Sequence, residues 1–370
     1  MNASVSNAVQ RVYNFSAGPA VLPLPVLEQV QRDLIALPGV GSSILEISHR
    51  SSHFIDIAND AKARITDLLS IPDTHEILFL QGGSRLQFSM IPMNLLEEGK
   101  AADYVLTGSW GKNAKKEAVK EGKVQVAWDG AECKYNRLPK QSELKLDPTA
   151  SYVHMTSNET IEGVQFLDEI EAGDVPVVVD CSSDIFCRPL PVDKYGLIYA
   201  CAQKNAGPAG VTMVVIRKDL LARGDAEMPG YMLYRNHAEA DSMWNTPPTF
   251  AIYVMGLVAK WLQEDIGGLA AMEKLNREKS SLLYDVIDNN ADFYAGHAEK
   301  ESRSLMNVTF RLPDADVEKK FFAAAEEQNL TNLKGHRSVG GVRASVYNAM
   351  PLAGVRALAD FMQQFAEDNK

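Results

Sequence analysis

The sequence predicts an α/β protein: a large domain with a mostly parallel mixed sheet between helices, followed by a smaller α+β domain. In the first two thirds of the 370 residues, short runs rich in β-branched and aromatic residues alternate with stretches of helical periodicity. Strands that alternate with helices form mostly parallel sheets covered on both faces. The runs are apolar at consecutive positions, which is typical of strands buried on both sides.

Six runs are expected to form the strands of this sheet. They are Glu76–Leu80, Ala102–Gly108, Ser151–Thr156, Val175–Asp180, Gly196–Cys201 and Val211–Ile216. Helices are expected at residues 52–69 and 85–96. The apolar face of the first helix consists of Ile57, Ala61, Ile65 and Leu68. Residues 250–262 are apolar but too few to cross a bilayer, so they indicate a buried helix.

The pattern changes near Asp265, where a glycine pair opens one long amphipathic helix that runs to residue 290. A strand at 304–312, a helix at 316–328, a strand at 342–348 and a helix at 352–367 complete the α+β part. We therefore expect a large domain at residues 13–265, whose first residues are able to pack on the small domain, and a small domain at 266–370. Residues 1–12 are expected to be a disordered tail, as loosely tethered termini usually are.

Composition excludes several classes of function. The net charge of −11 argues against nucleic-acid binding, because a phosphate backbone requires a basic surface. No CxxC spacing relates the cysteines Cys133, Cys181, Cys187 and Cys201. We expect neither a disulfide framework nor a metal site, and a reducing, cytoplasmic compartment. The amino-terminal residues contain no continuous apolar run, so neither a signal peptide nor membrane attachment is expected.

Functional groups are expected just after the strands, because ligands of α/β sheets bind at the carboxyl ends of strands. After the strand at 76–80, "QGGSRLQF" opens a helix, and its backbone N–H groups at Ser84 and Arg85 suit a phosphate. The alternative is a plain strand–helix turn with a serine cap. Asp180 ends another strand, where its carboxylate either faces a ligand cation or caps the next helix.

Lys204 follows the strand at 196–201. A desolvated lysine is a nucleophile for carbonyls, whereas a lysine that reaches the surface is only a solvated charge. Trp110, after a further strand, either stacks on a ring or packs in the core. Together, an anion site, a carboxylate and an amine meet the needs of pyridoxal phosphate, which requires partners for its phosphate, its pyridine nitrogen and its aldehyde.

Eight motifs in order resemble the phosphoserine aminotransferase family, class V of the fold-type I pyridoxal-phosphate enzymes. They are "NFSAGPA", "SHRS", "QGGSRLQF", "HMTSNETIEG", "DCSSD", "YACAQKNAGPAG", "WNTPPTF" and "LKGHRSVGGVRASVYNA". The resemblance extends from about Tyr13 to Phe365. It implies that Lys204 binds the cofactor covalently, Asp180 pairs with the pyridine nitrogen, Trp110 stacks on the ring and Thr160 contacts its hydroxyl side. It implies a phosphate site formed by Ser84, Arg85 and Gln203, with Asn245 and Thr246 from the partner subunit of a homodimer.

Histidine–arginine pairs in glycine- and serine-rich loops suit an anionic substrate, although they could also be solvated loop charges. The resemblance assigns Arg343 to the substrate α-carboxylate. It assigns the distal phosphate, or the glutamate side chain, to His49, Arg50, Arg85, His336 and Arg337, with one of these groups from the neighbouring subunit. The implied reaction transfers an amino group from L-glutamate to 3-phosphonooxypyruvate, and Lys204 acts as general base. The implied second acceptor is 3-hydroxy-2-oxo-4-phosphonooxybutanoate, of pyridoxine biosynthesis.

The sequence departs from the family at three positions. Ser84 replaces a frequent glycine, Leu86 replaces a small residue, and Ala17 lacks a hydroxyl near the substrate carboxylate.

Two other readings of the function remain. Another class V enzyme, such as a cysteine desulfurase, needs a late loop cysteine, but the last cysteine here is Cys201, and a serine–pyruvate-type enzyme has no need for the histidine–arginine pairs. A non-catalytic phosphometabolite-binding protein would not need Lys204.

Overall fold

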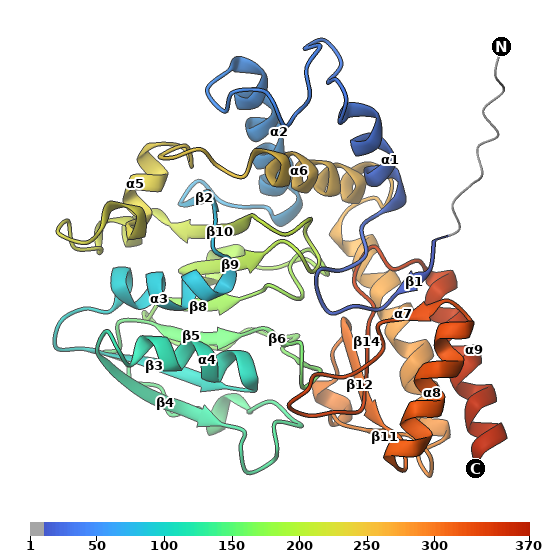
Figure 1. Ribbon diagram of the computed structural model, residues 1–370. Helices are drawn as coiled ribbons and strands as arrows, with labels where there is room; N and C mark the ends of the chain where they lie inside the picture. The colour runs from blue at the N-terminus through green and yellow to red at the C-terminus, as the bar shows by residue number, and fades with distance from the viewer. Residues whose placement is uncertain (1–10) are drawn as a thin grey trace, which may run out of the picture.

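The computed structural model describes residues 11–370 (Figure 1). The disorder predicted for the amino-terminal tail concerns mainly residues 1–10, which lie outside this range. The helices are α1 (Leu24–Asp33), α2 (Ser52–Leu69), α3 (Gly83–Leu95), α4 (Ser109–Ala118), α5 (Tyr234–Glu239), α6 (Thr249–Glu264), α7 (Leu269–Asn289), α8 (Ala315–Glu327) and α9 (Leu352–Asn369).

A seven-stranded sheet forms the centre of the larger part of the molecule. Its strands, in spatial order, are β2 (His75–Leu80), β10 (Thr212–Arg217), β9 (Leu197–Cys201), β8 (Val177–Asp180), β5 (Val153–Thr156), β3 (Ala101–Leu106) and β4 (Lys123–Asp129). Only β10 runs antiparallel to its neighbours, and the other adjacent pairs are parallel. The predicted mostly parallel mixed sheet is therefore confirmed.

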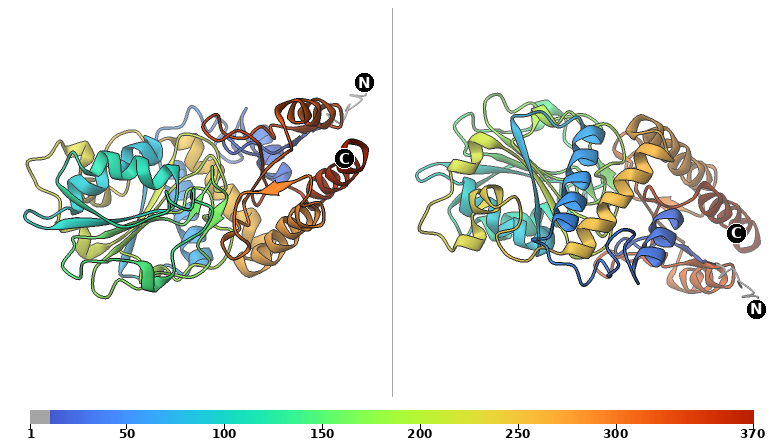
Figure 2. Two further views of the ribbon diagram at one scale, coloured as in Figure 1. Left: turned by 90° about the horizontal axis from the view of Figure 1, so that it is seen from below. Right: turned by 90° about the horizontal axis from the view of Figure 1, so that it is seen from above.

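Helices cover both faces of this sheet, which explains why its inner strands are apolar throughout. Along β2, Ile77 and Phe79 face a core shared with α2 and α6, whereas Leu78 and Leu80 face a core shared with α3 and α4. Figure 2 shows α2 and α6 side by side over one face. The helix predicted at residues 250–262 is α6, and no helix within residues 11–370 is long and apolar enough to cross a membrane.

Local signals placed most boundaries correctly. Helix α2 has the predicted bounds because Ser51 caps it, accepting a hydrogen bond from the N–H of Phe54 at 3.3 Å. Gly267 and Gly268, with φ of +87° and +95°, separate α6 from α7. The sequence patterns missed β4, an edge strand whose side chains are mostly exposed or half-buried.

A second core lies in the carboxyl-terminal part, where a three-stranded sheet packs against α7, α8 and α9. Its strands are β11 (Ala295–Gly296), β12 (Asn307–Arg311) and β14 (Val342–Ser345). The first described residues join this part, because β1 (Tyr13–Asn14) pairs with β13 (Leu330–Thr331) and Phe15 is fully buried in the second core. The α+β character is as predicted, whereas the domain boundary near Asp265 stays a prediction.

Helix α7 contributes to both cores. Met272 in its first half packs with the large core, and Leu283 in its second half packs with the small one. The loops that follow β8 and β9 lie between the large sheet and the small part (Figure 1). The carboxyl edge of the sheet therefore faces residues of the small part.

Candidate active site

Lys204 and Asp180 lie at the carboxyl ends of adjacent parallel strands. Asp180 is the last residue of β8, where it pairs in register with Tyr199 of β9, and Lys204 follows the end of β9. This placement results from the parallel topology, because the carboxyl ends of parallel strands meet at one edge of the sheet. Two residues 24 positions apart in the sequence thus come together in one site.

The Lys204 side chain is half-buried and held on two sides. Its Nζ donates a hydrogen bond to Oγ1 of Thr160 at 2.7 Å and lies 5.3 Å from the ring centroid of Trp110. Gly18, with φ of +140°, leaves space for the lysine stem, because a Cβ there would lie only 3.1 Å from Cγ of Lys204. The amine therefore projects between Thr160 and Trp110 instead of reaching freely into solvent.

The Asp180 carboxyl group is buried, and this burial raises its pKa, while the nearby charge of Lys204 and hydrogen bonds from Ser182 and Tyr199 act in the opposite direction. Oδ1 of Asp180 accepts from the N–H of Ser182 at 2.9 Å. The carboxylate thus closes a local turn at residues 182–186, and the helix cap of the alternative reading is wrong because no helix begins there. The nearby charge of Lys204 favours an ionised Asp180, as expected for a carboxylate that faces a cation.

The start of α3 lies beside this carboxylate. The hydroxyls of Ser84 and Ser182 share a hydrogen bond of 2.7 Å, which connects the first turn of α3 to the end of β8. The first N–H groups of a helix lack intrahelical acceptors, and the helix dipole adds positive charge there. Gly82 has φ of +84°, and a Cβ there would collide with Leu86 at 2.6 Å. Gly82, which has no side chain, therefore leaves the space that the Leu86 side chain occupies.

Two buried glutamates hold Trp110 at the start of α4, a feature that the sequence patterns did not reveal. Glu159 accepts hydrogen bonds from the N–H groups of Trp110 and Gly111, both at 2.9 Å, and Glu162 accepts from the N–H of Ser109 at 2.9 Å. Burial and the charge of Glu162 raise the pKa of Glu159. The only sequence signal was a pair of acidic residues in the otherwise uncharged segment "NETIEG".

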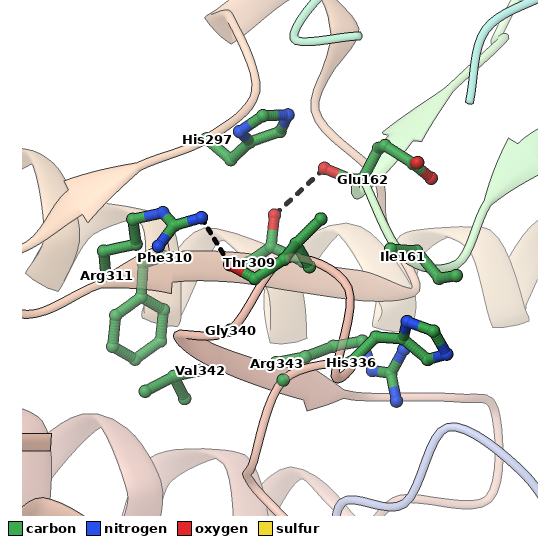
Figure 3. A pocket seen from close by; sticks show the side chains of 12 residues that line it. Ile161, Glu162, His297, Thr309, Phe310, Arg311, His336, Gly340, Val342 and Arg343 are labelled. Carbon is green, nitrogen blue, oxygen red and sulfur yellow. Dashed lines mark hydrogen bonds between the residues drawn. The ribbon is translucent and has the colours of Figure 1, made fainter. Parts of the chain in front are cut away.

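Arg343 lies on β14 in the small part of the molecule, and its positive charge and that of Lys204 both act on the buried Tyr347 hydroxyl. A small cavity of about 50 Å³ is lined by Arg343, His336, Glu162 and Thr309, among others (Figure 3). Burial lowers the pKa of Arg343, and its Nε has no hydrogen-bond partner within residues 11–370. Burial and the positive charges of Arg343 and Arg337 lower the pKa of His336. These three residues with basic side chains therefore lie close enough to influence one another.

The remaining predicted residues are placed less centrally. Arg85 is exposed, with its guanidinium carbon 5.6 Å from the Trp110 ring centroid, and Nε2 of Gln203 donates to Sγ of Cys201 at 3.2 Å. Among the predicted residues within the described range, only Thr160 forms a side-chain hydrogen bond with Lys204, Asp180 or Arg343. His49 is half-buried, and Arg50, Asn245 and Thr246 are exposed.

Sequence reasoning also missed residues whose role is to connect distant segments. Ser182 joins β8, β9 and α3, because Cys201 N–H donates to its Oγ at 3.1 Å in addition to the contact with Ser84. Tyr347 joins β14 to the amino-terminal segment, where its hydroxyl donates to the carbonyl oxygen of Ala17 at 2.8 Å. No local pattern marks such residues, because their partners lie on other elements, up to 98 positions away for Ser182 and 330 positions away for Tyr347.

The chain matches known aminotransferases along almost its entire length. The family model for class-V aminotransferases matches residues 12–358. The phosphoserine aminotransferase of Rhodopirellula baltica is 58% identical over 362 residues, which cover 97% of this chain and 96% of that protein.

Solved structures agree with this relationship. The phosphoserine aminotransferase of Bacillus circulans subsp. alkalophilus superposes with a TM-score of 0.95 at 47% identity, covering 97% of this chain and 99% of that one. The PLP-bound enzyme of Trichomonas vaginalis gives a TM-score of 0.90 at 40% identity, covering 95% of this chain and all of that one. The chain belongs to the class-V aminotransferase family and, within it, groups with the phosphoserine aminotransferases.

Proposed function

We propose that the protein is a phosphoserine aminotransferase. It uses pyridoxal phosphate to transfer the amino group of L-glutamate to 3-phosphonooxypyruvate, which yields O-phospho-L-serine and 2-oxoglutarate. The observation that supports this most directly is the placement of Lys204 between Thr160 and Trp110, beside Asp180, in a chain related to these enzymes over nearly its full length.

The residues present fit pyridoxal phosphate. The first turn of α3, with Ser84 and Arg85, offers N–H groups to a phosphate, and buried Asp180 offers a carboxylate to the pyridine nitrogen. Trp110 offers an aromatic face beside Lys204, and its ring nitrogen is buried with no partner among the described residues. When bound, the cofactor supplies an electron sink for the electrons released as the substrate Cα–H bond breaks.

The roles of the protein groups follow from their positions. The Nζ of Lys204, in its neutral form, removes the proton from the substrate Cα, and Thr160 holds that amine in place through the 2.7 Å hydrogen bond. Asp180 keeps a proton on the pyridine nitrogen through its negative charge. The buried glutamates behind Trp110 keep its helix in a fixed position, so that the aromatic face does not move.

The cationic groups select the substrate. Arg343 presents a planar guanidinium to the α-carboxylate that both substrates share. The phosphate of the acceptor and the side-chain carboxylate of glutamate are assigned to five further residues with basic side chains: His49, Arg50, Arg85, His336 and Arg337. A substrate with an anionic group at each end would thus be bound at both ends, whereas an amino acid with a neutral side chain would lose one set of contacts.

The decisive experiment combines a spectrum with an assay. Purified protein with pyridoxal phosphate should show a visible absorption band that borohydride removes, and should convert glutamate and 3-phosphonooxypyruvate to 2-oxoglutarate and phosphoserine. A protein that binds phosphometabolites without catalysis would show no band and no turnover, which would refute the proposal. An assay with 3-hydroxy-2-oxo-4-phosphonooxybutanoate, run in parallel, decides whether the pyridoxine-pathway acceptor is used.

Arg343→Ala is expected to raise the KM for glutamate and for 3-phosphonooxypyruvate by roughly 10- to 100-fold. This corresponds to the loss of a charged hydrogen bond of about 1.5–3 kcal/mol. Steady-state kinetics with each substrate varied in turn measures the effect. Arg356→Ala is the matched control, because Arg356 is an exposed arginine of α9 that pairs only with Glu278 at the surface. A rise in KM for only one substrate would show that Arg343 does not bind the shared carboxylate.

We further propose that the active enzyme is a homodimer in which each subunit completes the site of the other. Asn245 and Thr246 are exposed beside exposed Trp244, as expected for residues that reach a neighbouring chain. In the proposed dimer, one histidine–arginine pair of each active site also comes from the partner subunit. Such shared sites are common where two identical subunits meet about a two-fold axis.

Mixing two inactive variants tests this arrangement. We expect that Lys204→Ala and the double variant Asn245→Ala/Thr246→Ala are each inactive alone. After subunit exchange, mixed dimers should regain activity, because one of their two sites then carries no lesion. If Asn245 and Thr246 served their own chain's site, both sites of a mixed dimer would remain damaged. Persistent inactivity after verified exchange would therefore contradict the shared site.

A cytoplasmic location is part of the same proposal. Cys181, Cys187 and Cys201 are buried and Cys133 is half-buried, and all four are free thiols in the structure. Free thiols are the usual state of cysteines in a reducing compartment. Fractionation of cells that express the tagged protein measures its location directly.

A further inference from the structure

Lys279 is a buried cation that the proposed reaction does not use. It lies in the middle of α7, between the residues of this helix that join the large core and those that join the small core. Its side chain is fully buried, and it forms no ion pair with any residue from 11 to 370. A buried, unpaired ammonium is costly, so a specific set of contacts has to compensate for it.

Those contacts are backbone carbonyl groups of a single segment, residues 346–350. The Nζ of Lys279 donates to the carbonyl oxygens of Tyr347 at 2.8 Å and Val346 at 3.0 Å, with those of Met350 at 3.3 Å and Asn348 at 3.4 Å. Burial lowers the pKa of Lys279 to about 7. The oxygens can only accept hydrogen bonds, and an ammonium has three donors where a neutral amine has two. The contact set therefore favours the charged form.

The segment 346–350 connects the two sides of the active site. On one side it continues β14, where Arg343 lies three residues before Val346. On the other side the N–H of Asn348 donates to Oδ1 of Asn205 at 2.8 Å, directly after Lys204 in the chain. A turn in this segment thus joins the residue assigned to the substrate carboxylate to the residue assigned to the amine.

Further hydrogen bonds fix the same turn. The side chain of Asn348 donates to the carbonyl oxygen of Phe186 at 2.9 Å and accepts from Asn276 of α7 at 2.8 Å. Asn276 lies one helical turn before Lys279, so the two residues approach the segment from the same face of α7. Helix α7 therefore holds the segment through one cation and one amide.

We propose that Lys279 is a positioning residue: by drawing the carbonyl groups of residues 346–350 around one ammonium, it sets the separation between Arg343 and Lys204. This inference rests on the proposed function, which assigns those two residues to the substrate. In an α-amino acid the carboxylate and the reacting nitrogen share one carbon, so their protein partners need a defined spacing. Loss of the ammonium would allow the turn to relax and the spacing to vary.

Lys279→Met tests the inference, because methionine retains the apolar stem and removes the charge and donors. We expect kcat/KM to fall by about tenfold to a hundredfold for both substrates, with a rise in each KM, as a misplacement of about 1 Å can produce. Lys274→Met is the matched control on the same helix, since Lys274 is exposed and lies outside the segment's contacts. Unchanged KM values in Lys279→Met would overturn the proposal.

Amide hydrogen exchange of the apoprotein provides a readout that does not depend on catalysis. Exchange should accelerate in Lys279→Met at residues 342–350 and 203–207, while the rest of the small core keeps its protection. An increase spread evenly over the small core would indicate general destabilisation and would overturn a positioning role. Lys279→Arg, which keeps the charge, should recover part of the lost kcat/KM.

A double-mutant cycle tests the route from Lys279 to the amine. Asn205→Ala removes the acceptor that links the segment to Lys204, so its effect on kcat/KM should overlap with that of Lys279→Met and be less than additive. Fully additive effects would refute this route. If Lys279→Met does not fold, Asn205→Ala alone tests the proposal, because unchanged KM values in Asn205→Ala would also refute the link between the segment 346–350 and Lys204. If the wild-type protein itself showed no transaminase activity, the proposed function would be refuted. The amide hydrogen-exchange rates of Lys279→Met would then still test whether Lys279 holds the turn at residues 346–350.

Discussion

Lys204→Ala is expected to abolish transamination, with a loss of about 10⁴-fold or more, while the protein still folds. The expectation combines the loss of a general base with the loss of the nucleophile that holds the cofactor. The fold should survive because Lys204 is half-buried and its Nζ makes a single hydrogen bond, to Thr160. The rate of 2-oxoglutarate formation and the thermal unfolding of the apoprotein are the two measurements.

Lys218→Ala is the matched control for this variant. Lys218 also follows a strand, but β10 runs antiparallel to β9, so its end lies at the opposite edge of the sheet. The control should have wild-type turnover. Turnover of Lys204→Ala within about tenfold of wild type would refute the assignment of the amine, since general-base catalysis alone typically contributes a hundredfold or more.

Asp180→Asn is expected to lower kcat by roughly 10²–10³-fold, the usual effect of removing one well-placed electrostatic partner from a catalytic site. Asparagine keeps the shape of the side chain and can still accept the hydrogen bond from Ser182 N–H, so the change removes mainly the charge. Without that charge the pyridine nitrogen is no longer kept protonated. Steady-state kinetics at saturating substrate measures the loss, and Asp193→Asn, at an exposed site before β9, is the control.

The stability of Asp180→Asn separates a catalytic from a structural role. Burial raises the pKa of Asp180, so the folded apoprotein binds a proton more tightly than the unfolded chain. The contribution of this carboxyl group to stability therefore decreases as the pH rises through the unfolded and then the folded pKa. Removing the charge should leave the apoprotein at least as stable as wild type at neutral pH. A variant that loses activity and also unfolds more easily would point to a structural role instead.

Much of the fold could be predicted because it depends on local signals. The strand at 175–180 and the helix at 52–69 are recognisable from apolar runs, periodicity and a serine cap. The strand β4 was missed because an edge strand needs no continuous apolar run, and its exposed side chains include charged ones. Its pairing with β3 depends on the rest of the sheet, which no window of residues 123–129 contains.

The candidate site was predictable to the extent that it follows the strand ends. Asp180 and Lys204 were identifiable because both follow apolar strands, and the family resemblance suggested their roles. Glu159 and Lys279 were not identifiable, since the role of each depends on hydrogen bonds to residues of other elements. Glu159 holds the start of α4 from 48 and 49 positions away, and Lys279 holds carbonyl groups 67–71 positions away.

The sequence by itself determined the α/β class, the mostly parallel sheet, and the order in which an anion-binding turn, an acid and an amine follow its strands. These properties depend on the period of apolar residues and on groups adjacent in the chain. Only the tertiary structure decided how Lys204 lies against Thr160 and Trp110, and which carbonyl groups surround the Nζ of Lys279. Such contacts are set by packing between distant segments, where a displacement of one ångström separates a hydrogen bond from none.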